Sequence, residues 1–357
     1  MNQTKHREPA SLISFFCGAG GMDEGFRQAG FTTKLAYDVE EHCVNTLEQN
    51  HPEAEAKKRD LSDPKMTAER VISDWDELSE LPPVGVLGGP PCQSFSRSNV
   101  YKTNDDPRDT LPGHYGRLLN GLNEAFNLDF FVFENVPGLL DDQHIDLYKA
   151  FKQDAREAGF RVAERELNAI NFGVPQQRNR IFIVGLDCER YNRKFSFPDS
   201  LDGPVRTVKD AIGDLDEPVH FSRSLTPEDI EEATGHPNHW CMRPKSKKFD
   251  PGNNFLEPGN NQGRSFRALE WEEPSLTVAY GHREVHIHPE CHRRLSMFEA
   301  MRLQKFPDSY ELVGNMSQQI DMISDAVAPP VAKALADAFR EQAELQSEPQ
   351  MYSVTGG

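Results

Sequence analysis

The stretch LISFFCGAGGMDEGF, residues 12–26, predicts the architecture more directly than any other part of the sequence. An apolar run is followed by glycines at positions 18, 20 and 21 and then by a helical pattern. Glycine adopts backbone conformations with positive φ, which let a turn pass close to a ligand. The order of strand, glycine turn and helix therefore predicts the first unit of a doubly wound α/β domain.

Apolar runs alternate with amphipathic stretches through the first half of the chain, which is typical of parallel strands joined by crossover helices. The expected strands cover residues 12–16, 34–38, 84–87, 130–133 and 180–186. The expected helices cover residues 23–29, 40–49, 115–126 and 145–158, and a later one covers 330–343. We expect an α/β fold with a doubly wound, mostly parallel, Rossmann-like sheet and a smaller loop-rich domain.

The composition of the chain changes after residue 197. The next hundred residues are rich in Pro, Gly, Asn and His and have few periodic apolar runs, which predicts a loop-rich second lobe. A helical pattern returns at residues 295–304. We therefore divide the chain into a first lobe (1–197), a second lobe (198–295), a hinge and return to the first lobe (296–345) and a polar tail (346–357).

The charge and composition exclude some classes of protein. The chain has 357 residues and a net charge of -18, and no apolar run reaches the roughly 20 residues that a membrane helix needs. We therefore expect no membrane segment. Six scattered cysteines and a start without a cleavable signal pattern favour a reducing cytoplasm. The acidic bulk opposes nonspecific attraction to nucleic acid, so any nucleic-acid surface must be local.

Asp38 follows Gly18 by 20 residues and ends the second expected strand. A carboxylate at this spacing accepts hydrogen bonds from ribose hydroxyls in nucleoside pockets. Asp60 could face the same crevice and accept a hydrogen bond from an adenine amino group. The alternatives are a tight turn without a ligand and an Asp60 that is solvated or caps a helix.

Three further segments place reactive side chains near strand ends. In GGPPCQSFSRS, residues 88–98, two prolines fix the chain before Cys92, and a nucleophile needs a fixed and accessible position. Glu134 follows an apolar run whose burial would raise its pKa. Arg178 and Arg180 share one face of an extended segment and could clamp a phosphate or a carbonyl oxygen. Each residue also has an alternative when it is taken singly. Cys92 could be an inert buried thiol, and Glu134 could be a structural acid. The two arginines could lie on a solvated edge of the sheet.

These motifs, in this order, resemble the cytosine-C5 DNA methyltransferases. The similarity covers residues 12–198 and 264–340. Its motifs are FCGAGG (16–21), Asp38, Asp60, PPCQSFS (90–96), ENV (134–136), QQRNR (176–180) and HRRLSMFEAMRLQKFPDSY (292–310). The resemblance implies that the first lobe is the catalytic and cofactor-binding domain and that the second lobe is the target-recognition domain.

The resemblance implies a pocket for S-adenosyl-L-methionine, the methyl donor of the family. The residues that match its cofactor positions are Phe16, Gly18, Gly20, Asp38, Val39, Asp60, Leu61, Leu111 and Val327. The sequence departs from the family pattern at Ser324 and Asp325, where a Gly-Asn pair is usual, and at Phe298, where an Arg is usual. Asp325 thereby places an extra carboxylate beside the methionine end of the cofactor.

The resemblance also implies a mechanism. Cytosine C5 is a poor nucleophile until a thiolate adds at C6, and Cys92 would supply that thiolate. Glu134 would donate a proton or hydrogen bond at N3, and Arg180 would hold the carbonyl oxygen of the base. Arg178 would steady the catalytic loop or a phosphate. A base inside a duplex must first flip out, and residues 93–111 would close over it.

The candidate DNA contacts lie in this closing loop and in a basic part of the second lobe. Residues 236–267 hold six Lys or Arg and two acids, a pattern that favours phosphate contacts, with a solvated loop as the alternative. The predicted contacts are Ser94, Ser96, Arg97, Lys245, Lys247, Lys248 and Arg264. The segments HPNHWC (236–241) and HIHPECH (286–292) match no standard zinc spacing, so we expect no metal.

The expected function is methyl transfer from S-adenosyl-L-methionine to C5 of a flipped-out cytosine in a specific duplex DNA sequence. We expect a monomeric cytoplasmic enzyme, associated with the nucleoid. It is either a modification enzyme with a separately encoded cognate restriction endonuclease as a further partner or an orphan genome methylator. A tRNA cytosine-5 methyltransferase of the same family is the closest alternative. A nucleotide-binding oxidoreductase would not explain PPCQ together with ENV, and an inactive DNA-binding regulator would not need Cys92, Glu134 and Arg180.

Overall fold

The structure is a computed structural model that describes residues 10–91, 111–242, 246–249, 257–258, 266–277 and 286–347, without the side chains of residues 248 and 344–347. The predicted site residues outside this range are Cys92, Ser94, Ser96, Arg97, Lys245 and Arg264, together with the side chain of Lys248. Within the described part of the chain, no helix is long and apolar enough to cross a membrane.

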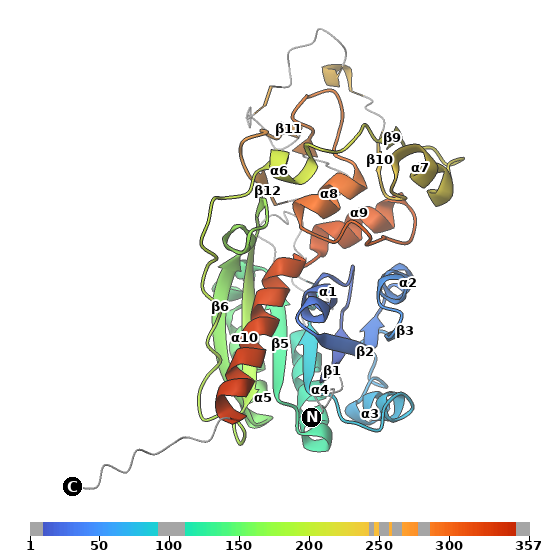
Figure 1. Ribbon diagram of the computed structural model, residues 1–357. Helices are drawn as coiled ribbons and strands as arrows, with labels where there is room; N and C mark the ends of the chain where they lie inside the picture. Colours follow the sequence, from blue (N-terminus) through green and yellow to red (C-terminus); the bar gives the residue numbers. More distant parts are fainter. Residues whose placement is uncertain are drawn as a thin grey trace, which may run out of the picture.

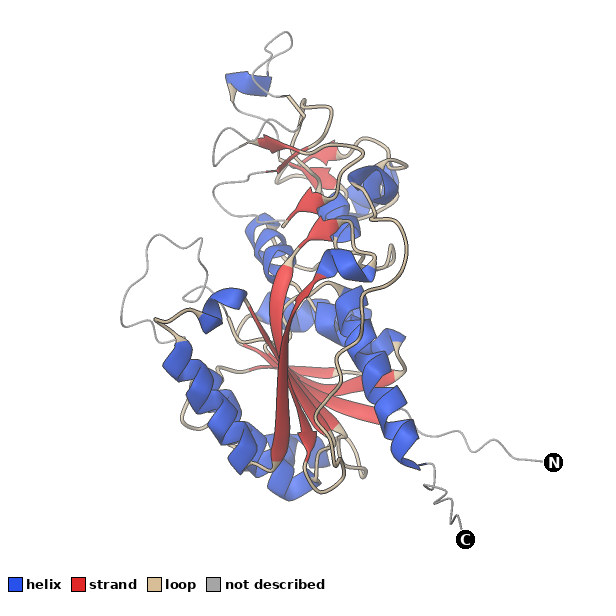
Figure 2. Cartoon of the chain, turned by 90° about the vertical axis from the view of Figure 1, so that its left-hand side faces the viewer, coloured by secondary structure: helices blue, strands red, loops and turns tan. Residues whose placement is uncertain are grey.

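A seven-stranded sheet with the order β3-β2-β1-β4-β5-β8-β6 forms the centre of the first lobe (Figure 2). Its strands are β1 (Ala10–Phe15), β2 (Phe31–Asp38), β3 (Glu55–Lys58), β4 (Gly85–Gly88), β5 (Phe130–Asn135), β6 (Phe160–Asn168) and β8 (Asn179–Asp187). Strand β8 runs antiparallel to β5 and β6, and the pairs from β3 to β5 are parallel. Central strands such as β5 are buried along their whole length because helices cover both faces of the sheet.

Helices pack on both faces of this sheet (Figure 1). They are α1 (Gly21–Gln28), α2 (Glu41–Asn50), α3 (Ala68–Asp76), α4 (Leu111–Phe126), α5 (Ile145–Glu157) and α10 (Pro329–Ser347). One apolar core joins the sheet to α3, α4 and α5, and a second core joins the opposite face to α1 and α10. The chain therefore returns from the second lobe to complete the first, as the sequence predicted for its last helix.

The second lobe is built from short elements around its own apolar core, which includes Trp240, Leu269, Phe298 and Ile320. The second lobe itself holds α6 (Val208–Ile212), α7 (Pro227–Thr234) and a short 3-10 helix at Lys247–Phe249, and the hinge adds α8 (Met297–Leu303) and α9 (Met316–Asp325) to the same core. Its strand pairs are β9 (Val219–His220) with β10 (Trp240–Cys241) and β11 (Arg267–Ala268) with β13 (His286–Ile287). Strand β12 (Ser275–Leu276) pairs with β7 (Gln176–Gln177), which connects this lobe to the segment before β8.

The expected fold class is confirmed, and the expected strands and helices of the first lobe are present with shifted ends. The expected strands did not include β3 or β6, and the expected helices did not include α3. Strand β6 has the mixed sequence FRVAERELN with a run of exposed residues at 164–166, because it forms the edge of the sheet. The antiparallel direction of β8 was also not predicted, since it depends on the β6–β8 hairpin.

Candidate active site

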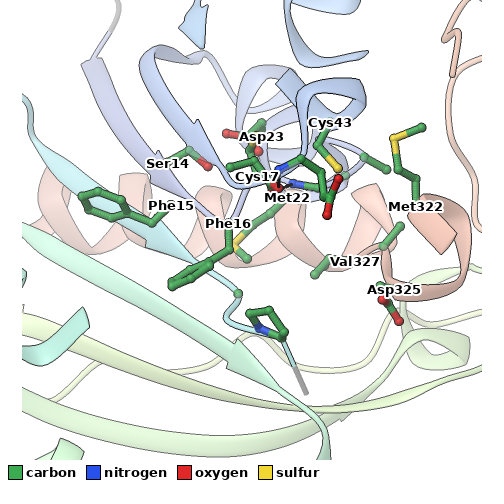
Figure 3. A pocket seen from close by; sticks show the side chains of 18 of the residues that line it. Ser14, Phe15, Phe16, Cys17, Met22, Asp23, Cys43, Met322, Asp325 and Val327 are labelled. Carbon is green, nitrogen blue, oxygen red and sulfur yellow. Dashed lines mark hydrogen bonds between the residues drawn. The ribbon is translucent and has the colours of Figure 1, made fainter. Parts of the chain in front are cut away.

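A cavity of about 480 Å³ opens at the carboxyl ends of β1, β2, β4 and β5. Its walls come from the glycine turn before α1, the start of α2, the segment after β4, and the end of α9 (Figure 3). The carboxyl edge of a doubly wound sheet is where such folds bind ligands, and the volume suits a small molecule. The described part of the chain thus has a pocket at the place that residues 12–26 predicted.

Asp38 ties the glycine turn to the end of β2. Its Oδ2 accepts a hydrogen bond from the backbone N–H of Gly18 (2.9 Å), and its Oδ1 accepts one from the N–H of Glu40 (2.9 Å). Phe16, Gly18 and Gly20 have φ values of 56°, 54° and 72°, so the turn is folded back tightly beside the cavity. Burial raises the pKa of the Asp38 carboxyl, although these two amides oppose the shift.

Glu134 and Arg180 form an ion pair on the cavity wall, with 3.0 Å between Oε1 of Glu134 and Nε of Arg180. The two residues lie on neighbouring antiparallel strands, β5 and β8, which fixes their positions. Burial raises the pKa of Glu134, and the guanidinium groups of Arg180 and Arg178 oppose this shift. The carboxyl group can therefore retain a proton in a site that also holds a cation beside it.

The segment leading to Cys92 enters the same cavity. Gly89, Pro90 and Pro91 line the cavity, and Asn135 Nδ2 donates a hydrogen bond to the carbonyl oxygen of Pro90 (3.2 Å). This contact joins the segment before Cys92 to the ENV motif at the ends of β4 and β5. Cys92 follows directly in the sequence and lies outside the described residues.

Arg178 is 2% exposed and donates a hydrogen bond from Nη2 to the carbonyl oxygen of Ser324 (2.8 Å). Its backbone N–H donates to Asn168 Oδ1 (3.1 Å). Arg178 and Arg180 both line a small second cavity, and Arg180 also lines the main cavity. A buried Arg178 can steady the end of α9, whereas a contact with a DNA phosphate would need an exposed side chain.

The other predicted cofactor residues divide into two groups. Phe16, Gly18, Asp38, Val39 and Val327 line the cavity, whereas Gly20, Asp60, Leu61 and Leu111 are not among its described lining residues. Asp60 Oδ1 accepts hydrogen bonds from the N–H and the hydroxyl of Ser62, as expected for the alternative of a local cap. Leu61 lies in the apolar core, Leu111 begins α4, and a side chain at position 20 would collide with Tyr310.

Apart from Asp325, the sequence analysis missed the cavity residues that α9 contributes. Gln318, Asp321 and Met322 line the cavity opposite the glycine turn, although they are about 300 positions away in the chain. Helix α9 begins with a capping box in which the Asn315 side chain accepts from the N–H groups of Ser317 and Gln318. That capping signal predicts a helix, but no local pattern predicts which face meets the cavity.

The histidines of the second lobe mostly make internal contacts. His236 Nε2 donates to the carbonyl oxygen of Tyr310 (3.1 Å), and the His239 ring contacts Ser296 Oγ (2.9 Å) and the carbonyl oxygen of Asp216 (2.7 Å). Among the described residues, His288, Glu290 and His292 place potential metal-ligand atoms within 4.8 Å of one another. The expectation of no metal stays a prediction. Lys247 is exposed, and its role in DNA binding also stays a prediction.

Comparisons with known proteins agree with this geometry. Residues 10–341 match the model of the C-5 cytosine-specific DNA methylase family. The Type II methyltransferase M.MthTI of Methanothermobacter thermautotrophicus is 33% identical, with 93% of this chain and 98% of that protein covered. The Type II methyltransferase M.NmeDI of Neisseria meningitidis serogroup C is 30% identical, with 96% of this chain and 86% of that protein covered. A solved structure of a putative DNA modification methyltransferase from an E. coli prophage has the same fold, with a TM-score of 0.76 at 24% identity over 94% of this chain and 99% of that one.

Proposed function

Because the chain belongs to the C-5 cytosine-specific DNA methylase family, we propose that it methylates C5 of a flipped-out cytosine in a specific duplex DNA sequence. The methyl donor is S-adenosyl-L-methionine and Cys92 is the nucleophile. One observation carries this proposal. The Glu134–Arg180 pair, the Pro90–Pro91 segment before Cys92 and the glycine turn held by Asp38 all line one cavity.

The cavity fits the cofactor in size and in chemistry. A volume of about 480 Å³ lies in the range of small-molecule sites. The glycine turn brings backbone close to the ligand, Asp38 offers a carboxylate to ribose hydroxyls, and Phe16 and Val327 offer apolar contacts. When bound, S-adenosyl-L-methionine supplies an electrophilic methyl group on a sulfonium. The chain then has to bind, orient and shield the reacting base.

The residues around the base act in a fixed order. The Cys92 thiolate adds to C6 of cytosine and makes C5 nucleophilic. The protonated Glu134 carboxyl donates to N3, where electron density accumulates, and Arg180 holds the carbonyl oxygen of the ring. Arg178 steadies the end of α9 behind this pair. After methyl transfer, loss of the C5 proton expels Cys92 and restores the ring.

The second lobe (198–295) would recognise the target sequence, and residues 93–111 would close over the flipped base. The proposed DNA contacts remain those that the sequence predicted in the closing loop and the basic segment. A cognate restriction endonuclease is a plausible partner because the curated relatives are Type II methyltransferases. The same names favour DNA over the tRNA alternative.

A mechanism-based trap tests the covalent step. A fluorine at C5 cannot leave as a proton does, so 5-fluorocytosine in mixed-sequence duplex DNA should hold the enzyme after methyl transfer. The wild type should give a protein–DNA band on a denaturing gel that requires S-adenosyl-L-methionine. Cys92→Ser should give no band while still binding the cofactor. The exposed Cys188→Ser variant is the matched control and should behave like the wild type. A band of full intensity with Cys92→Ser would contradict the mechanism.

A further inference from the structure

The glycine turn before α1 is contacted by a tyrosine of the hinge. Tyr310 lies between α8 and α9, and its hydroxyl donates a hydrogen bond to the carbonyl oxygen of Ala19 (2.7 Å). Ala19 belongs to the turn and lines the cavity, whereas Tyr310 is 2% exposed and is not among the described lining residues. Tyr310 therefore acts on the cavity through the backbone of the turn.

Gly20 makes room for this hydroxyl. Its φ of 72° lies in the left-handed region that favours glycine, and a Cβ at this position would collide with the Tyr310 hydroxyl. The sequence predicted Gly20 as a cofactor residue, yet it is not among the described residues that line the cavity. Its neighbours Ala19 and Gly21 do line it. Gly20 therefore serves the site by letting Tyr310 approach the turn.

The ring of Tyr310 is fixed by packing against two other rings. It is T-shaped to Phe306 and to His51, with ring centroids 5.0 Å and 6.1 Å away. Burial raises the pKa of Tyr310, so the hydroxyl stays protonated and can donate. A buried tyrosine ring held in this way keeps its O–H directed at one acceptor.

The backbone at Tyr310 is held by the second lobe. The N–H of Asn238 donates to Nδ1 of His236 (3.0 Å), so Nε2 of this histidine carries the proton that it donates to the carbonyl oxygen of Tyr310 (3.1 Å). The side chain of Asn238 accepts from the N–H of Leu312 (2.8 Å) and donates to its carbonyl oxygen (2.9 Å). The segment HPNHW (236–240) thus holds the chain around Tyr310 rather than a metal ion.

The same stretch of chain is also held by the first lobe. The side chain of Asn50 on α2 accepts from the N–H of Glu311 (2.9 Å) and donates to its carbonyl oxygen (2.8 Å). Thr46 Oγ1, also on α2, accepts from the N–H of Val313 (2.9 Å). Figure 1 shows α9, which follows this stretch, next to α2. Residues 310–313 are therefore fixed relative to α2, whose start lines the cavity.

We propose that Tyr310 is a positioning residue for the cofactor, because its hydroxyl holds the glycine turn in the conformation that S-adenosyl-L-methionine binds. This inference rests on the proposed function. Without the hydroxyl, the turn can relax in the free protein, and binding must then restore it at a cost in affinity. Glu134 and Arg180 are fixed separately, on β5 and β8, so the rate at saturating cofactor depends little on Tyr310.

Two tyrosine-to-phenylalanine variants of the full-length protein test the proposal by calorimetry. Tyr115 is the matched control, because it is also buried and donates to a backbone carbonyl oxygen, that of Val132 (3.0 Å), in the core around α4. Each variant loses one buried hydroxyl, so both should lose a similar amount of stability. The dissociation constant of S-adenosyl-L-methionine should rise about threefold to tenfold in Tyr310→Phe, the scale of one hydrogen bond. In Tyr115→Phe it should stay within about twofold of the wild type.

Two further measurements separate positioning of the turn from a general loss of structure. In Tyr310→Phe, the KM for S-adenosyl-L-methionine should rise with the dissociation constant, while the single-turnover rate at saturating cofactor stays within about twofold of the wild type. Hydrogen exchange at the backbone amides of residues 17–21 should be faster in the free variant than in the free wild type. Bound cofactor should restore the protection. In Tyr115→Phe these amides should exchange as in the wild type.

The outcomes for this inference and for the proposed function are distinguishable. An unchanged dissociation constant in Tyr310→Phe, or equal weakening in both variants, would overturn the positioning role and leave the proposed function intact. A large fall in the single-turnover rate at saturating cofactor would also overturn it, since Tyr310 would then affect the chemical step. Absence of S-adenosyl-L-methionine binding to the wild type would overturn both proposals together.

Discussion

Glu134 is the residue whose surroundings most clearly prepare it for chemistry. It is 6% exposed, and Gly89 leaves space beside its Oε2, since a Cβ at that position would lie 3.3 Å from the oxygen. Burial raises its pKa while Arg180 keeps it oriented on the cavity wall. A raised pKa favours the protonated form of this carboxyl group, and a fixed, protonated carboxyl can donate to a ring nitrogen.

Glu134→Gln should lower the single-turnover rate of methyl transfer by about 10²-fold to 10⁴-fold, because an amide has the same shape but cannot give up a proton. The protonated acid is the donor, so the wild-type rate should fall as the pH rises through the raised pKa of Glu134. This decline should be absent in the variant. Glu166→Gln, on the exposed part of β6, is the matched control. A rate within tenfold of the wild type in Glu134→Gln would count against the assignment.

The sequence predicted some site residues for reasons that the structure supports. Asp38 was singled out by its spacing from Gly18, and the two residues are joined by a hydrogen bond. Asp60 lies in a loop, where no pair of strands fixes its distance from the glycine turn. Its carboxylate instead accepts a hydrogen bond from the backbone N–H of Ser62. The spacing along the chain thus predicts a contact when two consecutive strands fix both partners. A loop residue lacks that constraint.

At the scale of elements, the packing of α1 against α10 depends on Gly25. A Cβ at this position would collide with the carbonyl oxygen of Pro329 and the Cβ of Ala332. Both contacts belong to the start of α10, so the glycine sets how closely the returning helix can approach. The two helices share the apolar core on this face of the sheet with β1 and β5.

Gly25→Ala should lower the free energy of unfolding by about 1–3 kcal/mol, the usual cost of an added methyl group in a packed interior. Gly113→Ala, inside α4, meets no atom within 4 Å and should leave stability unchanged or raise it by up to about 1 kcal/mol through helix propensity. Urea-induced unfolding measures both variants. If Gly25→Ala and the wild type had equal free energies of unfolding, α1 and α10 could move apart without loss of stability, and this prediction would be wrong.

The elements that the sequence predicted are those whose pattern is set locally. The buried central strand β5 begins with an uninterrupted apolar run at residues 130–133, and α10 has the spacing of a helix packed on one side. The edge strand β6 lacks this pattern because half of its surroundings is solvent. Its pairing with β8 fixes the position of Arg180, so this part of the site could not be derived from local sequence.

At the scale of the whole molecule, buried neutral histidines make the folded state sensitive to acid. His286 on β13 is 4% exposed, and burial, together with the charge of Arg267, lowers its pKa from 6.5 to about 4. Above pH 6.5 the ring is neutral in both the folded and the unfolded chain. As the pH falls toward 4, the unfolded chain takes up a proton more readily, so this contribution to stability is lost.

His286→Leu should therefore lose less stability than the wild type on acidification. Between pH 7 and pH 4.5 the difference in unfolding free energy should be about 2 kcal/mol smaller in the variant. The buried acids with raised pKa act in the opposite direction but are present in both proteins. Ile287→Val, a neighbouring buried change without a titrating group, should shift stability equally at both pH values. Parallel pH profiles for His286→Leu and the wild type would contradict this prediction.

The two lobes differ in how far the sequence predicted them. The first lobe follows from alternating strands and helices, and its site follows from motifs at strand ends. The second lobe consists of two-residue strands and short helices, whose arrangement depends on contacts between distant segments such as Asn238 with Leu312. Helix α9 of the hinge contributes Asp325 to the cavity, so the site is complete only after the chain has returned.

The most direct test of the central claim is the transfer of a labelled methyl group. The wild-type protein is incubated with labelled S-adenosyl-L-methionine and either mixed-sequence duplex DNA or tRNA, and the nucleic acid is digested to nucleosides. The account predicts label in 5-methylcytosine from DNA. Label found in tRNA alone, or no label in either substrate from a protein that binds the cofactor, would contradict it.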